Sequence, residues 1–577
     1  MEKQETVLFL SELAHVSRAE KFIAEHSDLT TAGYILVALD STIEWELARK
    51  RIPFLSGRDF RTRDTKPMIL AEEWATRLLT HPEWSFFVYR NVSFARVYFF
   101  PLQICLARIL YYADIITGVF TTYPSLARCV LFTPKNAVLG LLGQDHSVFA
   151  EAAMSTARGL GKEVVIAGDI QSVSPSSVVH SASFKIRRGF FSVVLGLLNV
   201  LVTLVRRPKK VRILAYDSWR NIAPVVRQVH SGEVVMIERL EAFVAGLKNI
   251  FGYRMRFVGF GSFISTSVEC TEAQALFKRE QERLNREFDY SFATFRGVSH
   301  AELLRDVLGI CVQDAIQRSL SKVDAAYALL EHLKPSVVLM RITASTLQSQ
   351  FPILAQVARV MGIPALEIQH GLNYNGPGTP SKFYNAEYLG VYGQLSIDEL
   401  VASGRSVGTT PIAIGSPRFD TYTLVKQKIK ENTPGKPLSV TVIAASPLLA
   451  VQLDTYDVEE YFKAIATAVK NIGGIAVTIK LRASTDRPEL FRPLIAKAFE
   501  GVPHTVVDTG SLIDLLSQSD IAVSCFSTAA IEVLLCGVPL TYLGLSPAEK
   551  MMGTYHFAPY ATAGAMEMAH TQGQFEE

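Results

Sequence analysis

Short apolar runs alternate with amphipathic stretches along most of the chain, a spacing typical of β-α units that build a parallel sheet. The first series predicts strands at 6–10, 34–40, 52–55, 129–133 and 163–167 and helices at 14–26, 43–50, 70–120 and 147–160. The long helical stretch at 70–120 interrupts the alternation. We therefore expect residues 1–175 to form one α/β domain with a helical insertion.

Two further series follow the same rule. The second predicts strands at 212–217, 233–237, 254–258, 336–340, 363–368, 388–392 and 411–414 and helices at 221–230, 270–289, 299–333 and 345–361. The third predicts strands at 438–443, 475–480, 504–508, 520–524 and 539–543 and helices at 457–472, 488–499, 511–518 and 528–536. A Pro/Gly-containing stretch at 430–438 separates the two series. Domains at 211–430 and 437–577 are expected, with a cleft between the carboxyl ends of their strands.

The apolar run from Gly189 to Val205 stands apart from these series. Lysines and arginines flank it on both sides, within 185–210. Three interpretations stay open: a helix buried between domains, a helix lying on an anionic membrane surface, and a transmembrane span. Its 17 residues are at the lower limit for crossing a bilayer, which makes the span the weakest of the three.

Composition narrows the class of function. The 58 basic and 55 acidic residues give a formal net charge of +3, too balanced for a nucleic-acid binder that works through phosphate contacts. The six cysteines form no C-x-x-C pair, so reduced thiols are expected. The residues after Met1 lack the pattern of a secretory leader. We expect a cytoplasmic protein, with the option of peripheral attachment at the inner membrane.

The most informative stretch runs from Asp520 to Pro539. A strand ends at Ser524, and Ser527 and Thr528 lie at the start of the next predicted helix, where free backbone N–H groups and hydroxyls suit a phosphate. Glu532 lies one turn further, where it can accept a hydrogen bond from a ribose hydroxyl. The structural alternative is a Ser/Thr helix cap followed by a solvated glutamate.

With this string, two further passages resemble the GT-B superfamily of nucleotide-sugar glycosyltransferases. They are 362–371, which contains Gln369-His370-Gly371, and 415–420, which contains Ser416 and Arg418. The chain looks most like cytoplasmic enzymes of bacterial capsule and surface-polysaccharide assembly. Polymer-forming glycerophosphotransferases and UDP-N-acetylglucosamine 2-epimerases share the fold. The resemblance covers roughly 210–560 and implies two Rossmann-like parallel-sheet domains facing a cleft, preceded by an extra N-terminal α/β domain.

The resemblance also implies roles for particular residues. His370 is the candidate base, the alternative being a histidine that only orders its loop. Ser416 and Arg418 are expected to face the cleft. Many relatives carry Lys-x-His-Pro where this chain has Lys480-Leu-Arg482, so both cations are candidates for holding donor phosphate. The alternative is that Lys480 and Arg482 are ordinary solvent-exposed residues at the end of a strand.

The acceptor side and the metal requirement complete the expectation. Asp217, Ser218 and Arg220 follow the first strand of the middle domain, where acceptor contact is expected, or where Asp217 simply caps a helix. No Asp-x-Asp stands at a strand end, and the resemblance implies neither metal nor other cofactor.

The sequence therefore predicts a glycosyltransferase that moves a sugar from a nucleotide-sugar donor to a surface-polysaccharide or lipid-linked glycan. Three alternatives stay open: a phosphotransferase using a CDP-glycerol-type donor, a nucleotide-sugar epimerase, and a non-catalytic scaffold on the same fold. After the strand at 539–543 the chain has one further predicted helix, near 563. The third domain is accordingly expected to close differently from its relatives or to lack a last helix.

Overall fold

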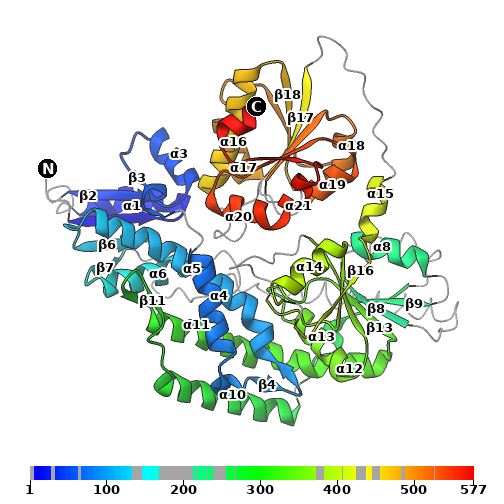
Figure 1. Ribbon diagram of the computed structural model, residues 1–577. Helices are drawn as coiled ribbons and strands as arrows, with labels where there is room; N and C mark the ends of the chain where they lie inside the picture. The colour runs from blue at the N-terminus through cyan, green and yellow to red at the C-terminus, as the bar shows by residue number, and fades with distance from the viewer. Residues whose placement is uncertain are drawn as a thin grey trace.

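Three parallel sheets, each covered by helices, follow one another along the chain in the computed structural model (Figure 1). The structure describes the following residues: 5–26, 33–62, 66–132, 146–167, 212–217, 219–229, 232–237, 255–265, 267–371, 382–405, 407–423, 437–444, 455–482, 488–525 and 527–577. The apolar run at 189–205 and the stretch at 430–436 lie outside them.

The first domain carries the first sheet and the helical insertion. Its strands are β1 (Thr6–Leu10), β2 (Tyr34–Ala38), β3 (Leu55–Ser56), β6 (Arg128–Leu131) and β7 (Glu163–Ile166), with a small hairpin of β4 (Val88–Tyr89) and β5 (Val92–Ser93). Its helices are α1 (Leu13–Glu25), α3 (Ser41–Arg49), α4 (Lys66–Leu79), α5 (Phe94–Thr122) and α6 (His146–Gly159).

The second domain carries the widest sheet. Its strands are β8 (Arg212–Tyr216), β9 (Glu233–Ile237), β10 (Met255–Val258), β13 (Val337–Met340), β14 (Ala365–Ile368), β15 (Tyr388–Val391) and β16 (Thr410–Ala413), with a hairpin of β11 (Thr294–Phe295) and β12 (Val298–Ser299). Its helices are α8 (Trp219–Gln228), α10 (Val268–Glu287), α11 (Ala301–Asp314), α12 (Leu320–Leu333), α13 (Gln350–Val360), α14 (Gln394–Ala402) and α15 (Asp420–Thr423).

The third domain begins at residue 437. Its strands are β17 (Leu438–Ile443), β18 (Ile475–Lys480), β19 (His504–Val507), β20 (Ile521–Ser524), β21 (Leu540–Leu543) and β22 (Glu567–Ala569). Its helices are α16 (Thr455–Ile472), α17 (Pro488–Ala498), α18 (Leu512–Leu516), α19 (Ala529–Leu535), α20 (Pro547–His556), α21 (Ala558–Thr562) and α22 (Gln572–Glu576).

All three sheets are wound in the same way. Their strand orders are β3-β2-β1-β6-β7, β10-β9-β8-β13-β14-β15-β16 and β19-β18-β17-β20-β21-β22. In each sheet the first strand lies at the centre, the next strands in sequence extend the sheet on one side of it, and the later strands extend it on the other side. The switch point lies between the first strand and its neighbour on that second side. In such sheets the crevice at the carboxyl ends of the two central strands is the usual ligand site. The predicted α/β class with three parallel-sheet units is confirmed.

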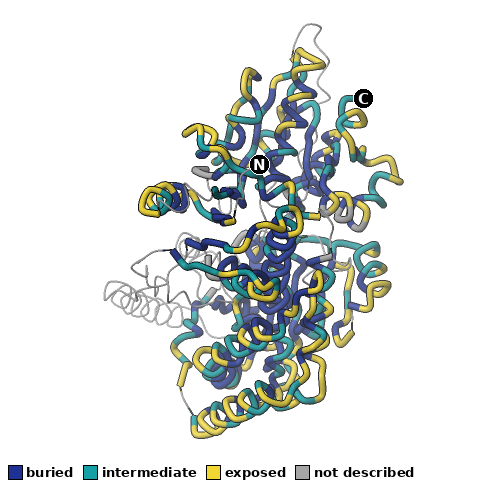
Figure 2. The backbone as a smooth tube through the Cα atoms, turned by 90° about the vertical axis from the view of Figure 1, so that its left-hand side faces the viewer, coloured by how far each residue is buried: buried dark blue, intermediate teal, exposed yellow. Residues whose placement is uncertain are grey.

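The helical insertion links the first domain to the second. The N-terminal part of α5, from Phe94 to Ala113, belongs to one apolar core together with α10, α11 and α12. The last turns of the same helix, Ile115 to Phe120, pack on β1 and β2 instead. One helix therefore contributes to the cores of two domains, and the unit expected at 1–175 is not separate from its neighbour. Figure 2 shows how much of this lower body of the molecule is buried.

Three local features differ from the sequence prediction. The single helix expected at 299–333 is interrupted by a π-helical turn at Ala315–Ser319. The β4–β5 hairpin was not predicted, and its turn places Arg90 and Asn91 at positive φ, which non-glycine residues rarely adopt. After the short helix α21 at Ala558–Thr562, the chain adds a sixth strand, β22, which pairs in parallel with β21, and then a short helix, α22.

Candidate functional site

His370 lies at the carboxyl edge of the second sheet, two residues beyond the end of β14. The backbone of Gln369 donates to the carbonyl of Gly390 at 2.9 Å, and its side-chain oxygen accepts from the N–H of Tyr392 at 2.8 Å. Its amide nitrogen donates to the carbonyl of Gly371 at 2.9 Å. Gln369 thus fixes the turn that presents His370, which explains why a buried amide precedes the histidine.

Both ring nitrogens of His370 have polar neighbours from the switch point of the sheet. Nε2 lies 2.5 Å from Nη2 of Arg341, the first residue after β13. Nδ1 lies 3.3 Å from Nδ2 of Asn221 in α8, and that amide also donates to both carboxylate oxygens of Asp217, at 3.1 Å each. Because a guanidinium has hydrogen-bond donors only, Nε2 of the ring is the acceptor in its contact with Arg341.

A buried carboxyl lies beneath this cluster. Glu367, on β14, accepts a hydrogen bond from the hydroxyl of Thr343, and Thr343 in turn accepts from the backbone N–H of Asn385 at 3.0 Å. Burial raises the pKa of Glu367 to about 8, and the nearby charge of Asp217 acts in the same direction. The carboxyl of Glu367, beneath the site, is therefore expected to be protonated below pH 8.

The carboxyl edge of the third sheet supplies the opposite wall. Arg482, just beyond β18, donates from Nη2 to the hydroxyl of Ser527 at 2.8 Å. Thr528 lies beside Gly371: a Cβ added to that glycine would stand 3.1 Å from the threonine hydroxyl oxygen. A side chain at 371 would press on Thr528, so glycine permits this close approach of the two domains.

Arg418 joins the two edges. Its Nη1 donates to the carbonyl of His370 at 3.2 Å, and its Nη2 contacts Oε1 of Glu532 in α19 at 3.0 Å. The hydroxyl of Tyr422 donates to the other carboxylate oxygen of Glu532. The ion pair is well buried, with side-chain exposures of 10% for Arg418 and 7% for Glu532. In this structure it therefore links the histidine loop to α19.

Of the residues expected from sequence, the structure brings together His370, Asp217, Arg418, Arg482, Ser527, Thr528 and Glu532. Glu532 already accepts from Arg418 and Tyr422, so in this structure its carboxylate lies against protein donors. Ser416 precedes the short 3-10 turn that carries Arg418 and is half-buried. Arg220 lies within α8, with its side chain outside the described part, and Ser218 lies outside the described residues.

Two expected residues lie elsewhere. Lys480 donates from Nζ to the carbonyl of Thr509 at 2.9 Å, on the β19 side of the third sheet, away from Ser527. Ser524 is fully buried, and its hydroxyl donates to the carbonyl of Cys525 at 3.3 Å. The strand position that the pattern placed at the edge, Ser524, therefore faces the core.

Asn221 ends the stretch 217–221 that the sequence marks as a cleft candidate, and two other residues of the cluster were not expected. Arg341 carried a usable signal, because it is a charged residue directly after a buried strand. Tyr422 carried none, since a tyrosine before a linker is ordinary. Their contacts arise only when segments far apart in sequence are folded together.

Two other features of the described residues bear on the choice of site. A cavity of about 790 Å³ lies between α4 and α14, but its Glu72 is already paired with Arg405 and Lys382. It lies at the amino end of β15, opposite to the histidine edge. In the described part of the chain no group of three or more His, Cys, Asp or Glu side chains could hold a metal ion.

One helix of the described chain, α5, is long and apolar enough to cross a membrane. However, 78% of its most apolar window is buried inside the protein. Its composition is accounted for by the core that it shares between the first and second domains.

No family model matches the sequence, and no curated protein matches it. Among solved structures, the chain is similar to the UDP-GlcNAc 2-epimerase of Neisseria meningitidis bound to UDP-GlcNAc, with 13% identity over 63% of this chain and 89% of that chain and a TM-score of 0.38. The UDP-GlcNAc 2-epimerase of Methanocaldococcus jannaschii is 12% identical over 63% of this chain and 90% of its own, with a TM-score of 0.37. MurG of Acinetobacter baumannii is 14% identical over 63% and 87%, with a TM-score of 0.33.

These similarities are distant, and the fold follows from the chain's own sheets. The second and third domains are both doubly wound, and their carboxyl edges meet through Arg418–Glu532 and through Gly371 beside Thr528. Two such domains facing one another make a GT-B-like fold, here preceded by an additional α/β domain.

Proposed function

We propose that the chain is a transferase that takes a nucleotide-sugar as donor at the meeting of the second and third sheets. One observation carries the proposal: Arg341, Arg418 and Arg482 all reach the place where the carboxyl edges of the two sheets meet, beside His370. Guanidinium groups gathered at switch points suit a diphosphate, because each can donate two parallel hydrogen bonds to phosphate oxygens.

The roles follow from these positions. Arg482 and the hydroxyls of Ser527 and Thr528 bind phosphate from the third domain. Arg341 approaches it from the second domain, and its departure from the imidazole to the phosphate would leave His370 open to an acceptor hydroxyl. His370 would then take the proton of that hydroxyl while the nucleotide phosphate leaves the anomeric carbon.

The acceptor is the less constrained part of the proposal. Asp217 and α8 border His370 on the side of the second domain, which is the place proposed for a surface-polysaccharide or lipid-linked glycan. A cytoplasmic location at the inner face of the membrane belongs to the same proposal. No metal is proposed, because the arginines offer positive charge for the leaving phosphate.

Donor binding is tested by thermal shift with UDP-, GDP-, CDP- and CMP-linked donors. Ligand at about 100 times its dissociation constant stabilises the folded state by roughly 2.7 kcal/mol, which raises the melting temperature measurably. We expect a shift with one nucleotide in the wild type and its loss in Arg482→Ala. The matched control is Arg492→Ala, which removes an exposed arginine of the same domain that pairs with Asp508. No shift with any donor would contradict the donor site.

The reaction is tested separately, by identifying the product. A glycosidic bond in an extended glycan supports the proposal, and His370→Ala should abolish its formation while leaving the nucleotide-induced shift in place. A phosphodiester in the product, seen by phosphorus NMR, would favour glycerophosphate transfer. A changed sugar in the free nucleotide-sugar, with no acceptor present, would favour an epimerase. Binding without turnover would favour a scaffold.

A further inference from the structure

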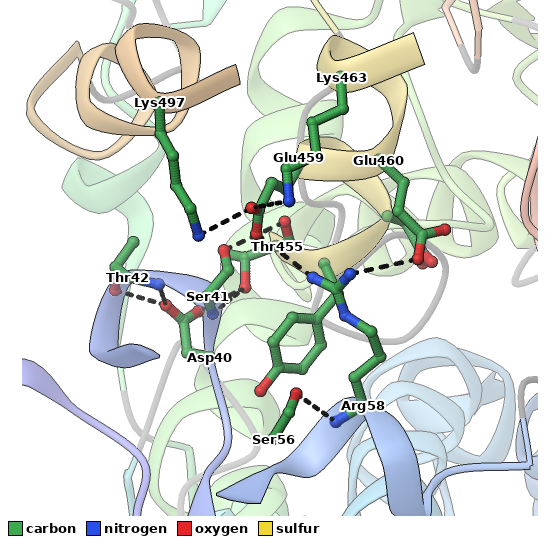
Figure 3. Close-up of polar contacts among 12 residues, drawn as sticks. Asp40, Ser41, Thr42, Ser56, Arg58, Thr455, Glu459, Glu460, Lys463 and Lys497 are labelled. Atoms are coloured by element: carbon green, nitrogen blue, oxygen red, sulfur yellow. Dashed lines mark hydrogen bonds and ion pairs between the residues drawn. The ribbon is translucent and has the colours of Figure 1, made fainter. Parts of the chain in front are cut away.

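The first domain touches the third at the carboxyl ends of β2 and β3. Figure 3 shows this contact, in which residues after the two strands meet the N-terminal turns of α16. We call it the α16 dock. It consists of Asp40, Ser41, Arg58 and Arg61 on the first domain and Thr455, Tyr456, Asp457, Glu459 and Glu460 on α16.

Asp40 occupies a position with a known use in other proteins. In doubly wound sheets that bind dinucleotides, an acidic residue after the second strand accepts from a ribose hydroxyl. Here Oδ1 of Asp40 accepts from the backbone N–H of Thr42 at 2.7 Å, which caps α3, and Oδ2 accepts from the hydroxyl of Thr455 at 2.8 Å. This carboxylate accepts from two hydroxyls: that of Thr42, which follows it in α3, and that of Thr455, which comes from the chain's own third domain.

The neighbouring contacts are also made across the two domains. The backbone N–H of Ser41 donates to the Thr455 hydroxyl at 3.1 Å, and the Ser41 hydroxyl donates to the Thr455 carbonyl at 3.3 Å. Tyr456 is fully buried, and its hydroxyl donates to the carbonyl of Ala38 at 2.8 Å. These contacts require a close fit between the end of β2 and the first turn of α16.

Charge reinforces the fit. Arg61 contacts Asp457 at 2.8 Å, and Arg58 contacts Glu459 at 3.3 Å and Glu460 at 3.4 Å. The Arg58 guanidinium also lies 4.8 Å from the centre of the Tyr456 ring, a cation–π distance. Glu459 is held as well by two lysines of its own domain, Lys463 at 2.6 Å and Lys497 at 2.8 Å. Its carboxylate is therefore positioned by its own domain as well as by Arg58.

The rest of the third domain makes few apolar contacts with its neighbours. Among the described residues, no apolar core cluster contains residues of both the first and the third domains. Among the apolar clusters of the described residues, the members from the second domain that join the third domain's core are Phe419 and Tyr422, near the start of the connection, and Tyr392, just after β15. Domains joined by polar contacts are expected to move relative to one another.

We propose that the α16 dock is a releasable latch that holds the third domain in its closed position. When it opens, the third domain turns about the contact at Phe419 and Tyr422, and Thr528 moves away from Gly371. The carboxyl edge of the first sheet thus serves as an intramolecular docking surface, and the extra domain sets how often the site opens. The latch does not depend on which reaction the site performs.

The test measures the separation of the first and third domains directly. Nitroxide labels are placed at Lys21→Cys in α1, where the side chain is 76% exposed, and at Ile472→Cys at the end of α16, which is 56% exposed. All six native cysteines are buried, which favours labelling at the two new sites. Double electron–electron resonance then gives the distribution of distances without any nucleotide.

We expect one short distance between the two labels in the wild type. In Arg58→Ala/Arg61→Ala we expect a second population of molecules in which this distance is longer. Loss of the three ion pairs that these arginines make should change the ratio of open to closed molecules about 10- to 100-fold. The matched control is Arg49→Ala/Arg492→Ala, which removes the same charge from arginines paired within their own domains and should keep the wild-type distribution. An unchanged distribution in the dock variant would overturn the proposal.

A second measurement needs no dock variant and so does not depend on its folding. Raising the salt from about 0.1 M to about 1 M shortens the screening length from roughly 10 Å to roughly 3 Å. The longer population should therefore grow with salt in the labelled wild type. A distribution that does not change with salt would show that the contact is not an electrostatic latch.

Discussion

The first and second domains are joined in a different way from the second and third. In the first case a 29-residue helix, α5, enters both cores, so the two domains share buried apolar surface. In the second case the domains meet through the Arg418–Glu532 ion pair, hydrogen bonds and a small aromatic contact. Apolar burial stabilises a joint without regard to direction, whereas polar contacts can exchange with water when they separate. The chain thus has one rigid body that contains two domains and one domain that can move.

The largest effect should come from cutting into the shared core. Phe277 on α10 is fully buried, and its ring centre lies 5.1 Å from that of Phe87 and 5.6 Å from that of Phe94, both in the first domain's insertion. Phe277→Ala should lower the free energy of unfolding by about 3–5 kcal/mol. In calorimetry the unfolding temperature of the first and second domains should fall, while the unfolding temperature of the third domain should not change.

The matched variant acts on the other side of the comparison. Phe499→Ala removes a ring that is 1% exposed in the core of the third domain and should lower only that domain's transition. If the whole chain unfolded in a single transition whose temperature fell equally in both variants, the polar joint would couple the unfolding of its domains as strongly as the shared core does.

Two buried carboxyls give an intermediate effect that depends on pH. Burial raises the pKa of Glu367 in the second domain and of Glu549 in the third to about 8. Between the ordinary pKa near 4.5 and 8 the folded protein holds protons that the unfolded chain has released, so stability falls as pH rises through this window. Each carboxyl contributes on the order of 1 kcal/mol per pH unit.

Replacement by glutamine removes this dependence and keeps a hydrogen-bonding side chain. Glu367→Gln should flatten the pH dependence of unfolding of the first and second domains only. Glu549→Gln should flatten that of the third domain only, and its glutamine can still serve in the capping box with Ser546. Denaturation at pH 5, 6, 7 and 8 gives the slopes. Unchanged slopes in both variants would show that the two carboxyls are ionised in the fold.

The smallest effect concerns one hydroxyl. Tyr456→Phe removes the hydrogen bond to Ala38 across the α16 dock and leaves the ring in place, which should weaken the joint by about 1 kcal/mol. Tyr461→Phe removes a similar bond to Ile443 within the third domain and serves as the control. In chemical denaturation, the unfolding midpoint of the third domain and that of the first and second domains should move further apart in Tyr456→Phe alone. Equal effects in the two variants would count against a separable third domain.

Periodicity was sufficient to predict the architecture because each strand is a short buried run between amphipathic helices. The candidate site was harder. A residue such as Arg418 or Glu532 could be expected at the edge from its place after a strand or at a helix start. The direction of a side chain could not, which is why Ser524 turned out to face the core and Lys480 the neighbouring strand. The dock was invisible in the sequence, since Asp40 and Thr455 are separated by 414 intervening positions and each resembles an ordinary helix cap.

The helix α5 also has a consequence for how the protein is made. Its apolar face is covered by α10, α11 and α12, which end at Leu333. At a synthesis rate of about 5–20 residues per second, the roughly 200 residues between Thr122 and Leu333 take about 10–40 s to emerge. During that interval α4, α6 and the first sheet are available to cover α5, but the face of α5 toward α10, α11 and α12 stays exposed. A chain whose synthesis stops in this interval is therefore expected to aggregate through that apolar face.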